Sequence, residues 1–358
     1  MTPYTLCHKA ECLQPYDPAE GVYRVRLDAN ESFLLPTAED RERMAAAAAA
    51  VALNRYPDPL ARELCGAFAQ LYGIDPATVT AGNGSDELIS VIFSSFLQKG
   101  EPVLTVAPDF SMYRFYTAIT ENPCIVLDKG EDMRIDVEAV IDTIRREEVR
   151  LFIFSNPCNP TSLGLGREDV RRIICETDAL IVLDEAYMDF WDQSLLAEAK
   201  QYDNLIILRT CSKMLGMAAL RCGFAVANER LTGVLRAAKS PYNVNAVTQA
   251  MAAVALNNPA YLREYQPLLL ASRDMLYEGF HSLEQDGLIE RVFKSCTNFV
   301  WVKTARAPEI LAFFKDRGII IRAFGEDYMR VTAGTQAENE EVLACIGFML
   351  RQGKERCV

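Results

Sequence analysis

Lys213 and its neighbours form the cluster with the clearest chemical potential in this sequence. Lys213 follows the apolar segment 205–208, which predicts a buried strand, and it lies beside the hydroxyl groups of Thr210 and Ser212. Arg221 follows eight residues after the lysine. A lysine amine in such a place can bond covalently to an aldehyde while its hydroxyl and guanidinium neighbours bind an anion. Most lysines are surface groups, so this cluster alone does not decide the chemistry.

A glycine turn with the sequence GNGSDE occupies residues 82–87, after a short predicted strand at Val79 and Thr80. It opens a helix that we expect over 88–97. Free backbone amides at the start of a helix, with glycines that allow close approach, form a phosphate cup. A glycine turn capped by Ser and Asp is also an ordinary helix N-terminus, so both interpretations stay open.

Polar turns follow two further apolar segments, each of which predicts a buried strand. Residues 155–161, SNPCNPT, come directly after segment 151–154, and their two Asn-Pro steps fix an Asn side chain at the strand end. Asp184 and Tyr187 follow segment 179–183 and place a carboxylate where that strand emerges. The alternatives are a plain turn for the first cluster and a solvated loop carboxylate for the second.

The four clusters together match what pyridoxal phosphate requires from a protein. An Asp protonates the ring nitrogen and makes the ring an electron sink, a Lys carries the aldehyde, and Asn and Tyr bind the ring hydroxyl. The glycine turn and the Arg bind the phosphate. The set of residues in this order therefore favours a pyridoxal-phosphate enzyme over the ordinary interpretation of each cluster.

The elements that position these clusters alternate between short apolar segments and helical patterns. After helices expected at 38–53 and 60–72, the alternation from Val79 to 226 predicts an α/β fold with a mostly parallel sheet covered by helices on both faces. Ligands bind at the carboxyl ends of the strands in such sheets. Beyond Pro241 long helical stretches and a few strands predict a smaller α+β domain. The expected organisation is an N-terminal arm at 1–36, a large pyridoxal-phosphate-binding α/β domain at 37–243 and a small C-terminal domain at 244–358.

Composition excludes several classes of protein. The chain has 358 residues, of which 50% are hydrophobic and 24% are charged, which is typical of a globular protein with a large core. It exceeds the usual limit of roughly 250 to 300 residues for a single core, so we expect two domains or one enlarged domain. Its net charge of −12 repels polyanions, so we expect no nucleic-acid partner.

The cysteines and histidines predict the cellular location of the protein and whether it binds a metal. The 11 cysteines are scattered without a Cys-x-x-Cys pair, which predicts reduced thiols in a cytoplasmic protein. The longest apolar run, 45–53, is too short to cross a bilayer core of about 30 Å, so we expect no membrane association. Only His8 and His281 are present, which is too few for a histidine-rich metal site, so we expect no metal site.

Short motifs spread over nearly the whole chain carry a family resemblance. They are LDANE at 27–31, YPDP at 56–59, NPCNPT at 156–161, VLDEAY at 182–187, LRTCSK at 208–213, LRCGF at 220–224, GIIIR at 318–322 and MRVTAGT at 329–335. In this order they resemble the fold-type-I, class I and II pyridoxal-phosphate-dependent aminotransferases, and among these the histidinol-phosphate aminotransferases. The resemblance implies an aminotransferase with a small-molecule amino donor and a keto acid as substrates.

The resemblance also implies a role for individual residues. Lys213 would hold the cofactor and move the proton between the substrate Cα and the cofactor carbon. Tyr56 would reach the neighbouring site of a homodimer. Tyr16 matches the arm that closes over the substrate, although a packed loop aromatic is an equal alternative. The implied cofactor-binding residues are Tyr56, Ser85, Asp86, Phe110, Asn159, Asp184, Tyr187, Thr210, Ser212, Lys213 and Arg221. The implied substrate-binding residues are Tyr16, Asn30, Arg322 and Arg330.

Several positions depart from the pattern of the family. Family members commonly have Pro-Thr-Tyr where this chain has Pro108, Asp109 and Phe110, so Phe110 can stack on the cofactor ring but offers no hydroxyl. Ser162 stands where glycine is usual, and the pair Ala218-Ala219 stands where an Ala-Gly pair is common. The residues after LDANE are Ser-Phe, where Asn-Pro is usual, which alters the segment expected beside the substrate.

The departures leave the substrate open at this point. The leading hypothesis is a transaminase that converts histidinol phosphate and 2-oxoglutarate to imidazole-acetol phosphate and glutamate. A threonine-phosphate decarboxylase of cobalamin synthesis and an aromatic amino-acid transaminase share the fold and the cofactor, so both remain alternatives. A relative without enzymatic activity would lack the Lys or the Asp, and both are present.

Overall fold

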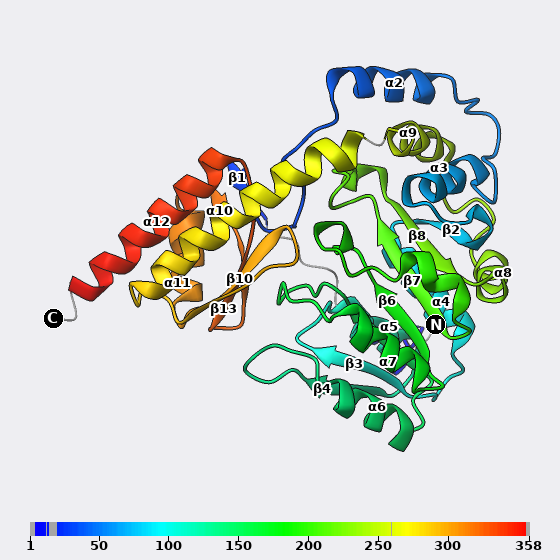
Figure 1. Ribbon diagram of the computed structural model, residues 1–358, viewed down its shortest axis with the longest axis horizontal. Helices are drawn as coiled ribbons and strands as arrows, with labels where there is room; N and C mark the ends of the chain where they lie inside the picture. Colours follow the sequence, from blue (N-terminus) through cyan, green and yellow to red (C-terminus); the bar gives the residue numbers. More distant parts are fainter. Residues whose placement is uncertain (1–3, 12, 14–19, 259, 356–358) are drawn as a thin grey trace.

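The computed structural model describes residues 4–11, 13, 20–258 and 260–355, and its largest element is a seven-stranded sheet. All neighbouring pairs are parallel except those of β8, which runs antiparallel to both of its neighbours. The expected mostly parallel sheet is therefore confirmed (Figure 1). In spatial order the strands are β2 (Val79–Asn83), β8 (Cys222–Ala227), β7 (Leu205–Thr210), β6 (Leu180–Asp184), β5 (Leu151–Ser155), β3 (Val103–Ala107) and β4 (Cys124–Asp128).

Helices cover both faces of this sheet because successive strand residues point to opposite sides. Ile206 and Leu208 belong to a core cluster with the residues of one set of helices, whereas Leu205 and Ile207 belong to a cluster with the other set. The first face carries α4 (Ser85–Phe96), α5 (Met112–Thr120) and α8 (Glu229–Ala238). The second face carries α3 (Arg62–Tyr72), α6 (Val137–Arg146), α7 (Arg167–Cys175) and α9 (Ala246–Leu256).

Two boundaries of the helices expected at 38–53, 60–72 and 88–97 differ from the expectation by three residues or more. The alanine-rich helix α2 (Ala38–Ala49) ends earlier than residue 53, because the chain turns after Ala50 and leads to Tyr56. Helix α4 begins at Ser85, not at residue 88, so the polar residues of the glycine turn form its first helical turn. The second difference matters for chemistry because it places the amides of Ser85 and Asp86 at the helix start.

A smaller unit follows the large sheet and lies to its left in Figure 1. Its antiparallel four-stranded sheet packs against long helices, as the composition beyond Pro241 predicts. The arm that was expected to be irregular contributes a short strand, β1 (Val25–Arg26), which pairs in parallel with β11 (Ile319–Ile320). In order, the sheet contains β12 (Arg322–Phe324), β13 (Tyr328–Thr332), β10 (Phe299–Lys303) and β9 (Arg291–Phe293), and the helices are α10 (Gln266–Gln285), α11 (Ala307–Lys315) and α12 (Gln336–Glu355).

Two hydrophobic clusters define where the units meet. Ala252 and Leu256 of α9 belong to the cluster of the large sheet, whereas Val25 and Leu27 belong to the cluster of the small unit. We therefore propose that the large domain extends to residue 256, beyond the expected boundary at 243. We also propose that the segment around Val25 belongs to the small domain. This segment leads directly to the site described below.

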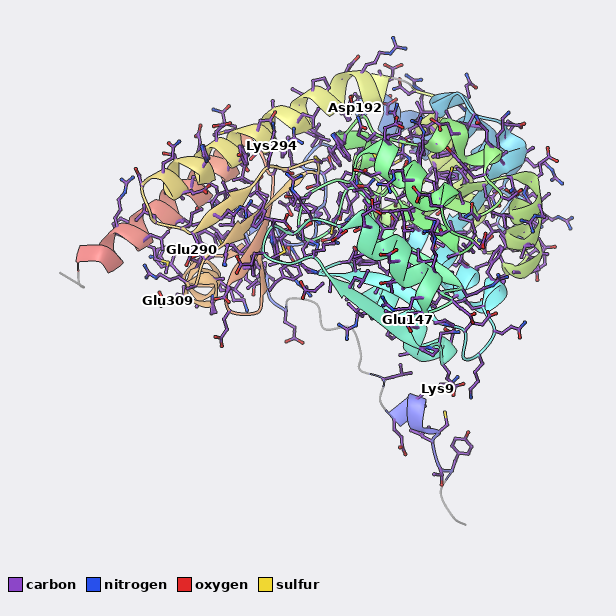
Figure 2. The ribbon with its side chains drawn as sticks, turned by 60° about the horizontal axis from the view of Figure 1, so that its bottom comes forward. Lys9, Glu147, Asp192, Glu290, Lys294 and Glu309 are labelled. Carbon is purple, nitrogen blue, oxygen red and sulfur yellow. The ribbon has the colours of Figure 1, made fainter. Side chains whose placement is uncertain are left out.

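Charged side chains such as Glu147 on the large unit and Glu309 on the small one point outwards into solvent (Figure 2). Among the residues that the structure describes, none of the helices is both long enough and apolar enough to cross a bilayer.

Candidate active site

A cavity of about 390 Å³ lies where the carboxyl ends of the parallel strands face the small unit. Ser155, Asp184 and Thr210, the last residues of β5, β6 and β7, line one side, and Arg322 and Arg330 line the other. The cavity brings together nearly all of the site residues expected from the sequence. These are Asn30, Ser85, Asp86, Phe110, Asn159, Asp184, Tyr187, Thr210, Ser212, Lys213, Arg221, Arg322 and Arg330.

Lys213 lies on the turn after β7, with its amine in the cavity. The Nζ donates a hydrogen bond to the carbonyl of Ala29 at 3.0 Å and lies 5.7 Å from the centre of the Tyr187 ring. The turn is held by side chains, since the Thr210 hydroxyl donates to Ser212 Oγ at 3.0 Å and accepts from the Ser212 amide at 3.2 Å. These bonds fix the direction in which the lysine leaves the strand.

Asp184 is a buried carboxyl that lines the cavity at the end of β6. The Tyr113 hydroxyl donates to its Oδ2 at 2.8 Å, and the Ala186 amide donates to its Oδ1 at 3.1 Å. Burial raises the pKa of Asp184 to about 7, although both hydrogen bonds favour the charged form. Burial also raises the pKa of Tyr113 well above its usual value, so this hydroxyl remains a donor. A carboxyl with a pKa near neutrality suits proton exchange with a bound basic nitrogen.

The start of α4 forms an open cup for an anion. Gly84 has a φ of 78°, and a Cβ there would lie 2.7 Å from Arg221 Nη2. A Cβ at Gly223 would lie 2.4 Å from the Ser85 amide nitrogen, so only glycine lets β8 approach the helix start this closely. Arg221 itself has a φ of 50°, and its guanidinium lies 3.6 Å from the Asp86 carboxylate. The glycines thus let the helix amides and the Arg221 guanidinium come close together, and these groups are the donors that a phosphate requires.

Two arginines project from the small unit. Arg322 and Arg330 are paired directly across β12 and β13, so their side chains share one face of the sheet. Arg330 donates to the Asn159 side-chain oxygen and to the carbonyl of Asp28. Like charges that are directly opposite each other are destabilising unless an anion lies nearby. This pair therefore makes a second place in the cavity where an anion is favoured.

Asn30 connects Thr332 of the small unit to Tyr187 in the cavity. It is 1% exposed, with a φ of 55°, and its Nδ2 donates to the Tyr187 hydroxyl at 2.8 Å. Its Oδ1 accepts from the Thr332 hydroxyl at 3.0 Å, and its carbonyl accepts from Asn298 Nδ2 at 3.1 Å. The side chain that was expected to meet substrate therefore also orients Tyr187.

Two of the expected site residues are not placed in the cavity. Tyr56 is 81% exposed and stacks on Tyr242, with 4.5 Å between the ring centres. It does not line the cavity of its own chain. Tyr16 lies outside the described residues.

The structure adds residues that the sequence reasoning did not select. Tyr113 lies on α5, three positions after Phe110, which comes just before this helix. A spacing of three could have indicated that both side chains face the cavity. Asp109 and Ser155 also line the cavity, and both belong to segments that drew attention for other reasons. Asp28 contributes through its backbone carbonyl, for which a side-chain motif gives no signal.

The model of the family "Aminotransferase class I and II" matches residues 23–346. This chain belongs to the class I and II aminotransferase family. The resemblance noted from the motifs is confirmed, and so is the expectation of an aminotransferase enzyme.

Relatives of this class I and II aminotransferase cover nearly its full length. A histidinol-phosphate aminotransferase of Clostridium novyi (strain NT) is 38% identical over 93% of this chain and 94% of its own. The crystal structure of a histidinol-phosphate aminotransferase from Sinorhizobium meliloti in complex with pyridoxal-5'-phosphate has a TM-score of 0.86, with 24% identity over 97% of this chain and 98% of that chain. An L-threonine-O-3-phosphate decarboxylase from Porphyromonas gingivalis has a TM-score of 0.75, with 22% identity over 91% and 99% of the two chains. At such identities the two solved structures establish the fold alone.

The residues of this aminotransferase fit pyridoxal phosphate as a group. The amides at the start of α4 and the nearby Arg221 guanidinium suit the phosphate, and the amine of Lys213 faces the same cavity. Asp184 offers a carboxyl for a ring nitrogen, and Phe110 offers an aromatic face. Each part of the cofactor therefore has a chemically matched partner among the residues of this cavity.

Proposed function

We propose that this aminotransferase uses pyridoxal phosphate to convert histidinol phosphate and 2-oxoglutarate to imidazole-acetol phosphate and glutamate. The observation that carries the proposal is the 38% identity over almost the whole chain with a relative of that name. The paired arginines support it, because both the phosphorylated and the dicarboxylic substrates are anions.

In this proposal the large unit holds the cofactor. When bound, pyridoxal phosphate supplies an aldehyde for the amine and an electron sink for the bond that breaks. Lys213 would hold the aldehyde carbon, Asp184 would keep the ring nitrogen protonated, and Phe110 would stack on the ring. Asn159 and Tyr187 would bind the ring oxygen. The phosphate would be held by Ser85, Asp86, Ser212, Arg221 and, from a second copy of the chain, Tyr56, and Thr210 would lie behind the ring.

Lys213 would also move the proton in the reaction. Its amine lies in the cavity, 5.7 Å from the centre of the Tyr187 ring, and would serve as the base that moves the proton of the substrate Cα. The Thr210 hydroxyl accepts from the Ser212 amide and so holds the backbone of this turn. This arrangement keeps the proposed base in the cavity.

The small unit would select the substrate. Arg330 is held by Asn159 and the Asp28 carbonyl, so its guanidinium is oriented before substrate binds. Arg322 is paired opposite it and would contact the far end of the substrate. Glutamate has two carboxylates, and histidinol phosphate has a phosphate and no carboxylate. A forked guanidinium binds either anion, so the same pair can serve both half-reactions.

We further propose a homodimer in which each Tyr56 completes the phosphate cup of the partner. Its exposure of 81%, despite its aromatic ring, supports a place in an interface. The partner contacts would be symmetric about one two-fold axis. We also propose a cytoplasmic location, for which the buried free thiols of Cys65, Cys211 and Cys222 are the support.

Single-turnover measurements test the substrate proposal. The holoenzyme mixed with glutamate alone should release one equivalent of 2-oxoglutarate per site. Mixed with histidinol phosphate alone, it should release one equivalent of the keto product. Carbon dioxide released from O-phosphothreonine, with no keto product from either amine, would instead establish a decarboxylase.

A further inference from the structure

Lys129 is a buried cation for which the proposed reaction has no use. It follows β4, and its side chain is 1% exposed. The Nζ donates to the carbonyl of Pro108 at 2.9 Å and to Cys158 Sγ at 3.0 Å, and it lies 3.9 Å from Asp109 Oδ2. A buried charge is costly unless it is compensated, so its partners indicate what it does.

Asp109 is the charged partner, and its side chain is 2% exposed. Its Oδ1 accepts from the Phe110 amide at 2.7 Å, and its Oδ2 accepts from the Ser155 amide at 3.2 Å. The Ser155 hydroxyl donates to the same carboxylate. Burial raises the pKa of Asp109, and the charge of Lys129 with the Ser155 hydrogen bonds opposes that rise. The carboxylate thus links the loop after β3 to the end of β5.

This link occurs where the backbone ladder between the two strands stops. β3 and β5 are paired at Val103 with Leu151 and at Leu104 with Phe152, near the ends of the strands that lie away from the cavity. At the cavity end the Asp109 carboxylate bridges the strands instead. Lys129 adds the neighbouring strand β4 to this connection.

The bridge leads directly to residues that face the cofactor space and the substrate space. Ser155 Oγ accepts from the Asn159 amide at 3.1 Å, and the Asn159 side chain in turn accepts from Arg330. Phe110 is bonded to Asp109 through its own amide. A shift of the carboxylate therefore moves both the aromatic face and the Asn159–Arg330 contact.

We infer that Lys129 and Asp109 are positioning residues, a charge-compensated pair that joins the ends of β3, β4 and β5 and sets the places of Phe110 and Asn159. The inference rests on the proposed function only in that Asn159 and Phe110 face the cofactor. Lys129 does not line the cavity, and the pair acts through the bonds of Asp109 to Phe110 and Ser155.

A comparison of single and double variants tests this inference. Lys129→Met leaves the carboxylate buried without its cation, so Asp109 becomes protonated and its bonds to Ser155 weaken. We expect the KM for glutamate to rise about tenfold, a size typical of coupling between contacting residues, with a smaller change in kcat. The double variant Lys129→Met with Asp109→Asn removes both charges and keeps an acceptor, so it should recover most of the loss. Lys99→Met is the matched control, because Lys99 is 72% exposed and pairs with Glu121 at the surface.

Two further readouts separate positioning from general loss of stability. The visible circular dichroism of the bound cofactor should decrease in Lys129→Met and recover in the double variant, whatever the substrate is. Ser155→Ala removes the hydroxyl between Asp109 and Asn159 and leaves the ion pair intact, so it should also raise KM. This variant tests the inference even if Lys129→Met does not fold. A double variant as impaired as Lys129→Met, or a Ser155→Ala protein with the KM and dichroism of the unmodified enzyme, would overturn the inference. If the enzyme did not turn over histidinol phosphate but these dichroism changes were present, only the proposed substrate would be contradicted.

Discussion

The two sides of the cavity are built in different ways. On the large unit, the residues of the same chain that are proposed to hold the cofactor lie near the ends of buried strands or at the start of α4, within residues 85–221. On the small unit, Asp28, Asn30 and Arg330 are held by contacts between residues about 300 positions apart in sequence. The proposed cofactor side therefore depends on local geometry, whereas the proposed substrate side depends on contacts between segments far apart in the sequence.

The largest effect should come from the centre of the cofactor side. Lys213→Ala removes both the proposed attachment and the proposed base, so turnover should fall by at least about 10³-fold, since general base catalysis alone contributes 10²–10⁴. Steady-state assays with glutamate measure the loss. Borohydride should fix the cofactor on Lys213 in the unmodified protein, as shown by a peptide map. Lys200→Ala, at an exposed lysine, is the control for Lys213→Ala. A borohydride label on any lysine other than Lys213 would contradict the assignment.

Replacing Asp184, the proposed partner of the ring nitrogen, should reduce turnover without loss of cofactor binding. Asp184→Asn should reduce kcat by about 10² to 10³, because a buried electrostatic partner of the reacting group is lost. The phosphate cup remains, so equilibrium dialysis should show retention of the cofactor. Near-normal turnover in this variant would remove Asp184 from the cofactor side.

The same residue predicts how the stability of the cofactor-free protein depends on pH. The pKa of Asp184 is about 7 in the folded chain, against an ordinary value of about 3.9 in the unfolded chain. The folded state therefore binds more protons between these values, and the free energy of unfolding should decrease as pH rises from about 4 to 7. The loss attributed to this group is on the order of a few kcal/mol, at about 1.4 kcal/mol per pKa unit. Urea denaturation at a series of pH values measures it, and Asp184→Asn should show a flatter dependence.

A change on the small unit should affect substrate and spare the cofactor. Arg322→Lys keeps the charge and removes the forked donor, so KM for histidinol phosphate should rise by about tenfold to a hundredfold. Cofactor affinity should stay within a factor of about two. If cofactor affinity fell as much as substrate affinity, the separation into two sides would be wrong.

A comparable effect, without loss of the dimer, should come from the proposed partner contact. Tyr56→Phe removes one hydrogen bond to a charged group, which is worth about 1.5 to 3 kcal/mol, so cofactor retention should weaken by roughly tenfold to a hundredfold. Sedimentation should show a dimer in both proteins. A fully active monomer would exclude the contact.

The residues of the proposed cofactor side could be argued from local sequence patterns, whereas those of the proposed substrate side rested on the family resemblance, and the difference has a physical reason. Lys213 and Asp184 each follow an apolar segment long enough to form a buried strand, so their positions could be inferred locally. Strand β1 has two residues and forms only because β11 is available as a partner. Lys129 gives no signal in the sequence, because its burial depends on Pro108 and Cys158 from two other strand ends.

The hydrogen bond between the Asn30 amide and Thr332 has a consequence for biosynthesis. It joins residues 302 positions apart, so it cannot form until nearly the whole chain has left the ribosome. Arg221, the last residue proposed for the cofactor side, is made about 110 residues earlier. At about 5 to 20 residues per second, that interval lasts on the order of 5 to 20 seconds. A nascent chain can therefore contain every residue of its own proposed cofactor side while Arg322 and Arg330, the arginines proposed to bind the substrate, are still untranslated.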